Sequence, residues 1–250
     1  MCLILLALEA HPRYPLIIAA NRDEFFNRKT LPLHEWDVPE ILGGKDLVAG
    51  GTWLGIDKKK RISAITNFRD LKNIIPDAPS RGRLTYNYLI ENIGAYDYLK
   101  KLKADNQTFN GYNLLLSDEN GFYHFSNYEN KINKLENGIH GLSNALLNTP
   151  WPKVELGKEK LSGCIENDNL DDDSLFNLLY DSKMAADEKL PSTGVPIDLE
   201  RNLSSMFIKT NGYGTRCSSV IKIDHQGIGS FAERTYDEQG NHIDIVKFPF

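Results

Sequence analysis

The sequence predicts an α+β fold with two stacked, mainly antiparallel β-sheets and helices outside them. Apolar and polar patterns follow the order strands, helices, strands, helices, strands, rather than the repeated βαβ units of a parallel sheet. The chain has 250 residues, of which 41% are hydrophobic, so it is long enough to bury a sizeable core. Because no internal repeat and no low-complexity linker divides it, we predict a single domain over residues 1–250.

The first part of the chain carries mostly strand patterns. Apolar runs at 2–8 and 16–20 are followed by a long irregular stretch that contains Pro32 and Pro39. A strand pair is predicted at Thr52–Ile56 and Ile62–Asn67, and residues 82–104 carry helical spacing. Further short strands are predicted at Tyr112–Ser117, Gly121–Asn127, Lys131–Leu135 and Gly138–Ser143.

The second part begins with two helices and ends in strands. Thr149 is the predicted N-cap and Pro150 the first residue of a helix that runs to about Cys164. The triplet Asp171-Asp172-Asp173 suggests either a metal site or a helix start. Carboxylates are favoured at helix N-termini and no His or Cys cluster joins them, so we favour the helix. Strands are predicted at Met206–Thr210, Ser218–Asp224, Gly229–Thr235 and Ile243–Phe248.

Composition excludes several classes of function. The net charge is −5 with both signs interspersed, so we expect no nucleic-acid partner. No apolar run has the length of a membrane span, and the first run lacks the basic leader of a signal peptide. Three distant cysteines favour a reducing compartment, and we predict a cytoplasmic protein. The basic cluster 58–61 is interpreted as a hairpin turn rather than a phosphate site. The six histidines show no metal spacing, so we predict no metal and no cofactor.

Cys2 is the most informative residue. If Met1 is removed, Cys2 carries a thiol and a free α-amine on one carbon, with reference pKa values of about 8.5 and about 7.7–8.0. This pairing of nucleophile and base is the N-terminal version of nucleophilic catalysis. The alternative is a cysteine that behaves as a small buried hydrophobe.

Two charged residues early in the chain, Arg22 and Asp23, are candidates for assisting Cys2. Asn21-Arg22-Asp23-Glu24 follows an apolar strand, and in isolation it would be interpreted as a solvated turn. An Arg near Cys2 would favour the thiolate, whereas an Asp near the α-amine could accept its hydrogen bond.

Three later residues are also candidates. Asn144 follows a predicted strand and is a possible oxyanion donor, with an Asn in a turn as the alternative. Arg216 could fix a carboxylate or order Cys2, with a surface Arg as the alternative. Trp53 lies in a Gly-rich segment that matches neither a Walker loop nor a dinucleotide fingerprint, and it either lines a pocket or belongs to the core.

Taken together, these motifs resemble the NRDE family, also called the Transport and Golgi organisation 2 family. They span most of the chain in order. The matching segments are Met1-Cys2-Leu3-Ile4, Asn21-Arg22-Asp23-Glu24, Gly50-Gly51-Thr52-Trp53-Leu54-Gly55, Asn67-Phe68-Arg69, Ser80-Arg81-Gly82, Gly141-Leu142-Ser143-Asn144, Trp151-Pro152-Lys153 and Tyr213-Gly214-Thr215-Arg216.

The resemblance implies the fold of N-terminal nucleophile hydrolases, a four-layer αββα sandwich. Its closest chemical analogue is the group of bile-salt hydrolases and penicillin V acylases, and the positions that match the catalytic residues of that group are Cys2, Arg22, Asp23, Asn144 and Arg216. The early Arg and Asp are separated in the acylases but adjacent here. Adjacent strand residues point to opposite faces, which leaves open whether both face Cys2. The same motifs supply candidate substrate-binding residues, namely Asn21, Glu24, Trp53, Asn67 and Arg69.

Two functions follow from the resemblance and stay open at this point. The first is a cysteine amidohydrolase that acts on non-peptide carbon–nitrogen bonds of a small-molecule amide. The second is a haem- or lipid-binding carrier without turnover, because eukaryotic members of the family are implicated in haem trafficking. Haem would then be a ligand rather than a cofactor. The sequence predicts no oligomeric state.

Overall fold

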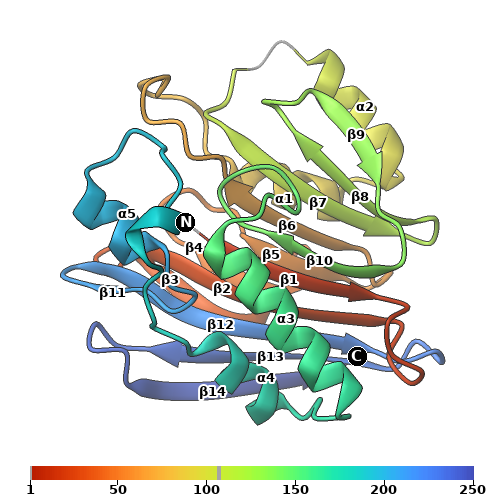
Figure 1. Ribbon diagram of the computed structural model, residues 1–250. Coiled ribbons are helices and arrows are strands. Elements are labelled where there is room, and N and C mark those ends of the chain that lie inside the picture. Colours follow the sequence, from red (N-terminus) through yellow and green to blue (C-terminus); the bar gives the residue numbers. More distant parts are fainter. Residues whose placement is uncertain (1, 106–107) are drawn as a thin grey trace. The chain divides into compact units, whose positions relative to one another are not determined.

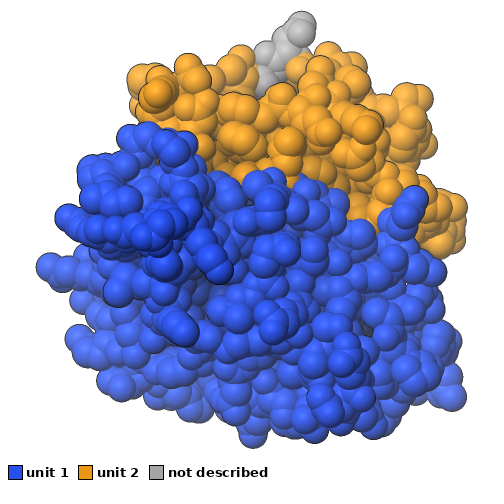
Figure 2. Space-filling view, viewed as in Figure 1, with its two compact units in different colours: residues 1–27, 136–143, 147–250 blue, residues 28–135, 144–146 orange. Residues whose placement is uncertain are grey.

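The computed structural model describes residues 2–105 and 108–250, and within them the chain divides into two compact units (Figure 2). Unit 1 comprises the residues up to Asn27, Glu136–Ser143 and Leu147–Phe250, and unit 2 comprises Arg28–Leu135 and Asn144–Leu146. Neither unit is one continuous stretch of chain. The single domain over residues 1–250 stays a prediction.

Unit 1 contains a seven-stranded sheet whose strands are all paired antiparallel. The order is β10-β1-β2-β12-β13-β14, with β11 paired to β12. The predicted antiparallel strands at both ends of the chain are confirmed, except that only the last two residues of Met206–Thr210 form a strand. The bounds are β1 (Cys2–Leu8), β2 (Leu16–Phe25), β10 (Gly138–Leu142), β11 (Lys209–Thr210), β12 (Tyr213–Ile223), β13 (Gly229–Tyr236) and β14 (His242–Pro249).

Helices α3 (Pro152–Glu166) and α4 (Asp172–Leu179) pack on one face of this sheet (Figure 1). The odd-numbered residues of β1 and β2 form the core with them. Side chains alternate along a strand, so the even-numbered residues, Cys2 among them, lie on the other face. Further along the chain are a 3₁₀ turn, η1 (Asp187–Lys189), and helix α5 (Ile197–Leu203). The core residues are Leu3, Leu5, Ala7, Ile17, Ala19, Val154, Leu161, Leu170, Leu175, Phe176, Leu178, Leu179, Met206, Val220 and Ala232.

The start of α3 corrects the prediction by two residues. Trp151 is the N-cap and Pro152 is the first helical residue, rather than Thr149 and Pro150. The Trp151 carbonyl accepts from the amides of Val154 and Glu155 at 2.8 and 3.0 Å, so the first helical hydrogen bonds begin there. Two Pro residues fit the same sequence signal, and the signal cannot choose between them.

The helix interpretation of the acidic triplet is confirmed. Asp171 is the N-cap of α4, and its Oδ1 accepts from the amide of Ser174 at 3.0 Å. Asp172 pairs with Lys222 of β12 at 2.8 Å, and Asp173 pairs with Arg234 of β13 at 2.5 Å. The triplet therefore caps the helix and ties it to the sheet.

Unit 2 contains a second seven-stranded antiparallel sheet in the order β3-β4-β5-β6-β7-β8-β9. The first two strands lie in the stretch that the sequence left irregular. Pro32 fits because β3 is an edge strand whose register shifts between Leu31 and His34, where no ladder hydrogen bond is needed. The bounds are β3 (Thr30–Glu35), β4 (Ile41–Asp46), β5 (Leu54–Asp57), β6 (Ile62–Asn67), β7 (Tyr112–Asp118), β8 (Gly121–Ser126) and β9 (Lys131–Lys134).

Two helices, α1 (Gly82–Ile90) and α2 (Ala95–Ala104), pack on this second sheet. The helical spacing over 82–104 therefore belongs to two helices with a break at 91–94. Arg61 stabilises the break, because its guanidinium donates to the carbonyls of Leu89 and Ile93 at 3.0 and 2.9 Å. The basic cluster 58–61 forms the predicted turn between β5 and β6. No helix in the described ranges is long and apolar enough to cross a membrane.

Candidate functional site

Strand β2 continues through the polar run Asn21–Glu24, which was expected to follow the strand. Arg22 lies opposite Cys2 on β1 and opposite Cys217 on β12, and Asp23 lies opposite Thr215. Polar residues can stay in the strand because the sheet and its neighbours supply their partners. The strand therefore presents successive residues of this run to opposite faces.

Cys2, Arg22 and Cys217 form a row across three strands on the sheet face away from α3 and α4. Directly paired residues share a face, with Cβ atoms about 4.5–5.5 Å apart. Strands are spaced at about 4.8 Å, so the two cysteines are about 10 Å apart, too far for a disulfide. Both thiols are free and buried.

Both thiols are held in the protonated form. Burial raises the pKa of the Cys2 thiol, and the charge of Asp23 raises it further, while Arg22 lowers it. Burial raises the pKa of Cys217 well above its usual range, and Glu233 adds to the effect. A protonated Cys2 needs a base before it can act as a nucleophile.

Asp23 points to the opposite face from Arg22. The Thr215 hydroxyl donates to Asp23 Oδ1 at 2.7 Å, and the carboxyl is 1% exposed. Burial raises the pKa of Asp23, whereas the charge of Lys153 on α3 lowers it. A buried carboxyl with a perturbed pKa and a specific charged neighbour is typical of functional sites.

Lys153 is a charged residue near Asp23 that the sequence did not place among the candidates. It is 2% exposed, and it lies in the first turn of α3. Lys is almost never fully buried without a partner. Its only sequence signal was its place in the Trp151-Pro152-Lys153 motif.

The Asn21 side chain links β2 to three other segments of unit 1. Its Nδ2 donates to the carbonyls of Leu179 and Met206 at 3.0 and 2.8 Å, and its Oδ1 accepts from the Ser218 hydroxyl at 2.6 Å. The side chain is fully buried. This geometry suits a structural role for Asn21, and its side chain is engaged with groups of the fold instead of being offered to a substrate.

We predict that Asn21→Ala lowers the free energy of unfolding by about 2–4 kcal/mol, because two carbonyls and a hydroxyl lose a buried partner. Urea denaturation of the variant and the parent protein measures this difference. Asn202→Ala, on α5, is the control and should change stability by less than about 0.5 kcal/mol. A loss for Asn21→Ala as small as that of the control would contradict the structural role.

Ser143 and Arg216 complete the unit 1 site. The Ser143 hydroxyl donates to the Cys2 carbonyl at 2.9 Å. Arg216 lies at a β-bulge between Thr215 and Cys217, and its Nη1 donates to the carbonyls of Phe25 and Phe26 at 3.1 and 3.3 Å. Burial and the charge of Arg22 lower the pKa of Arg216. Bulges commonly re-aim a side chain beside a functional site.

The remaining candidate residues belong either to unit 1 or to unit 2. Glu24 is half-buried in unit 1, and its Oε1 accepts from the amide of Phe25 at 2.9 Å. Asn144 belongs to unit 2, where its Nδ2 donates to the Asn67 carbonyl at 2.8 Å and its carbonyl accepts from the Arg69 amide at 2.7 Å. Trp53 is half-buried and packs against the unit 2 core. The structure thus groups Cys2, Arg22, Asp23 and Arg216 in unit 1, and Asn144, Asn67 and Arg69 in unit 2.

A buried polar chain holds the 144–146 segment within unit 2. Asn113 Nδ2 donates to the Ala145 carbonyl at 2.9 Å and to Thr66 Oγ1 at 3.2 Å. Its Oδ1 is 3.2 Å from His124 Nε2, so the amide geometry requires that Nε2 carries the proton and donates. Burial lowers the pKa of His124 to about 4. The imidazole is therefore neutral near pH 7.

This shift predicts an acid-sensitive contribution to stability. The unfolded chain protonates His124 near pH 6.5 and the folded chain only near about 4, so stability is complete above pH 6.5 and is lost as the pH falls toward 4. The loss is about 3 kcal/mol. His124→Gln should flatten this part of the profile of unfolding free energy against pH, measured by denaturant titration. An unchanged slope between pH 6.5 and 4 would contradict it.

Two solved structures share the fold. A Caenorhabditis elegans N-acylethanolamine-hydrolyzing acid amidase (NAAA) ortholog superposes with a TM-score of 0.52 at 12% identity, covering 88% of this chain and 92% of that one. The C2A mutant of the conjugated bile acid hydrolase from Clostridium perfringens gives 0.51 at 14% identity, covering 100% and 97%. The fold is therefore that of the N-terminal nucleophile hydrolases, as the resemblance implied.

Sequence comparison then identifies the family. The model of the Transport and Golgi organisation 2 family matches residues 1–238. The Mus musculus Transport and Golgi organization 2 homolog is 32% identical over 94% of this chain and 93% of the relative. The Homo sapiens homolog is 31% identical over 100% and 99%. This chain belongs to the Transport and Golgi organisation 2 family.

Proposed function

We propose that this chain is an N-terminal cysteine amidohydrolase that cleaves non-peptide amide bonds through an acyl-enzyme. The observation that carries the proposal is the position of Cys2 at the start of β1, directly opposite Arg22 and next to the Asp23 position of β2. The fold supports it, because the two solved neighbours are named as an N-acylethanolamine-hydrolyzing acid amidase ortholog and a conjugated bile acid hydrolase. Membership of the family does not itself supply an activity.

The α-amine of Cys2 is the proposed base. It becomes free only when Met1 is removed, and Met1 lies outside the described residues. β2 extends past Arg22 to Asp23, so the amine that begins β1 would lie beside the Asp23 position. The main-chain amine lies in the plane of the sheet, and it can therefore be reached by a carboxyl on the face opposite to Arg22. This removes the difficulty that Arg22 and Asp23 point to different faces.

The reaction would proceed in two steps. The α-amine takes the thiol proton, and Sγ attacks the amide carbonyl carbon to form a tetrahedral intermediate. The carbon–nitrogen bond then breaks, and the protonated α-amine gives its proton to the leaving amine. Water, deprotonated by the same amine, attacks the thioester and releases the carboxylic acid and the Cys2 thiol. The assignment of Asn144 as an oxyanion donor stays a prediction from the sequence, because Asn144 belongs to unit 2.

The acyl-enzyme is the species to trap. The purified protein is mixed with a panel of N-acyl amides, quenched in acid and analysed by intact mass and by peptide mapping. The proposal expects a mass increase equal to the acyl group on the peptide that begins with Cys2. Absence of any adduct across the panel, with Met1 shown to be removed, would count against it.

The competing proposal is a haem or lipid carrier on the same fold. It expects stoichiometric binding that does not depend on removal of Met1 and gives no acyl-enzyme. A haem titration followed by absorbance distinguishes the two. A saturable spectral change that persists in the Cys2→Ala variant, with no acylation in the parent protein, would favour the carrier.

A further inference from the structure

Arg22 is a buried cation whose charge no described side chain pairs. Its exposed fraction is 9%. Within residues 2–105 and 108–250, its guanidinium makes no hydrogen bond, ion pair or ring contact. Removing a charge from water without giving it a partner is unfavourable. An anionic ligand that supplies the counter-charge would offset this cost.

The nearby carboxylates are engaged with other groups. Asp23 is on the opposite face, where it accepts from Thr215 at 2.7 Å. Glu233 shares the face of Arg22, but it accepts from the Ser219 hydroxyl at 3.3 Å and lies on β13, beyond β12. The charge of Glu24 raises the pKa of Arg216, but burial and the charge of Arg22 lower that pKa by more.

A second guanidinium strengthens the positive charge beside Cys2. Arg216 is half-buried at the bulge of β12, and the charges of Arg216 and Arg22 act on each other strongly enough to lower the pKa of Arg216. Two like charges held this close repel each other. An anion between them would relieve both the repulsion and the cost of burial.

We propose that Arg22, assisted by Arg216, binds a carboxylate of the substrate, so that the preferred substrates are N-acyl amino acids. This rests on the proposed function and names its substrate class. Arg22 is directly opposite Cys2, with Cβ atoms about 5 Å apart. In an N-acyl α-amino acid the carboxylate is three bonds from the amide carbonyl carbon, which matches that short separation. The planar guanidinium suits bidentate binding of a carboxylate.

Binding is measured without turnover. In a Cys2→Ala background, isothermal titration compares N-octanoylglycine with N-octanoylethanolamine, which share the acyl chain but differ in charge. We expect the glycine conjugate to bind at least about tenfold more tightly, a preference that weakens with added salt. Equal affinity for the two probes would overturn the proposal.

Arginine variants test whether Arg22 causes the preference for the glycine conjugate. Arg22→Gln should abolish it, and Arg22→Lys should retain part of it, because Lys keeps the charge but not the fork of donors. Arg13→Gln, an exposed residue whose guanidinium lies 4.9 Å from the Tyr14 ring, is the control and should leave the preference unchanged. Thermal unfolding confirms that each variant is folded. A preference that survives Arg22→Gln would assign the anion site elsewhere.

Experiments with the parent protein distinguish the carboxylate-binding site from the proposed hydrolase activity. Formation of the octanoyl thioester at equal rates from both probes would support the hydrolase and overturn the carboxylate site. Selective binding of the glycine conjugate without any thioester would support the anion site and overturn the hydrolase.

Discussion

Replacing Cys2 with Ala is expected to abolish amide hydrolysis, with a loss of about 10⁵-fold or more in kcat. Loss of the nucleophile alone removes nearly the whole catalytic advantage of a concerted site. Cys2 is buried and makes no disulfide, so the smaller side chain should leave the fold intact. The measurement is single-turnover hydrolysis of the substrate selected from the N-acyl amide panel.

The control for this variant is Cys217→Ala. Cys217 is also buried, lies on the same face and has a raised thiol pKa, but it lies mid-strand and carries no free amine. It should retain most of the activity. Equal activity of Cys2→Ala and the parent protein would show that Cys2 is not the nucleophile.

Lys153→Met should shift the pH dependence of hydrolysis. The charge of Lys153 lowers the pKa of Asp23 against the larger effect of burial. Without that charge the pKa of Asp23 rises further, so the carboxylate that we propose orients the α-amine is lost at higher pH. We expect the acid limb of kcat/KM to move up by about one pH unit, which is about tenfold at a fixed pH on that limb.

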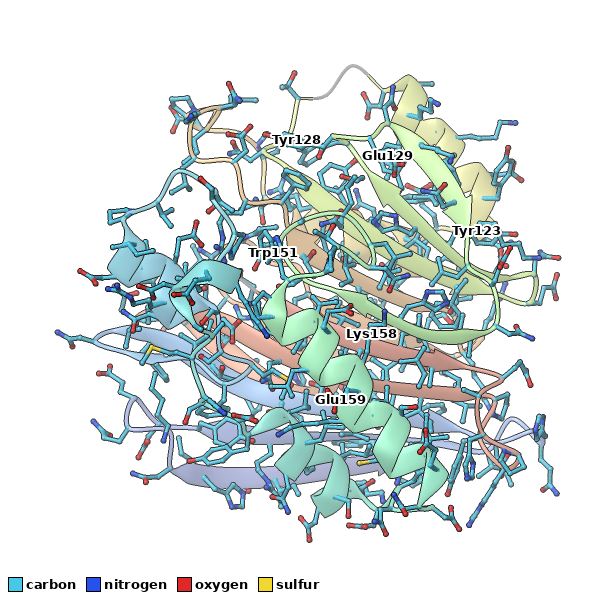
Figure 3. All side chains as sticks on the ribbon, viewed as in Figure 1. Tyr123, Tyr128, Glu129, Trp151, Lys158 and Glu159 are labelled. Atoms are coloured by element: carbon cyan, nitrogen blue, oxygen red, sulfur yellow. The ribbon has the colours of Figure 1, made fainter. Side chains whose placement is uncertain are left out.

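The matched control for this prediction is Lys158→Met on the same helix. Lys158 lies farther along α3 from Trp151 (Figure 3) and is half-buried near Glu155, with 3.5 Å between Nζ and Oε1. Its removal should leave the acid limb in place. Asp23→Asn removes the titrating group, so adding Lys153→Met to it should shift nothing further. Identical acid limbs in Lys153→Met and the parent protein would contradict the coupling.

The free energy of unfolding should also depend on the ionisation of Asp23. The pKa of Asp23 is raised in the folded state, so the folded chain holds its proton to higher pH than the unfolded chain. Ionised Asp23 therefore costs stability at neutral pH, and this cost declines as the pH falls below the raised pKa and is gone below the pKa of the unfolded chain. The site keeps a carboxylate that a stability optimum would replace, as functional sites often do.

The fold was largely predictable from the sequence, because long apolar runs and helical spacing reflect local burial. The exceptions have physical causes. Asn21 and Asp23 were assigned to the end of a strand, yet they continue it, because carbonyls of Leu179 and Met206 and the hydroxyl of Thr215 satisfy them. Such partners are distant in sequence and give no local signal. Strand β3 was missed because Pro32 is tolerated only at an edge.

The site was less predictable than the fold. The motifs identified Cys2, Arg22 and Asp23, and the register places Arg22 opposite Cys2. Lys153 was missed because a single Lys in the first turn of a helix is usually exposed. Its burial beside Asp23 follows only from the packing of α3 on the sheet. Asn21 is the opposite case, because it was a candidate for substrate binding and its side chain instead makes buried hydrogen bonds within unit 1.

The most direct test of an activated N-terminal nucleophile is the intact mass of the purified protein before and after brief treatment with a thiol-trapping reagent at neutral pH. We predict loss of Met1 and a single rapid addition that peptide mapping assigns to Cys2, while the buried Cys217 reacts slowly. Retention of Met1 with an unreactive Cys2 would contradict it, because the thiol would then have no α-amine to take its proton.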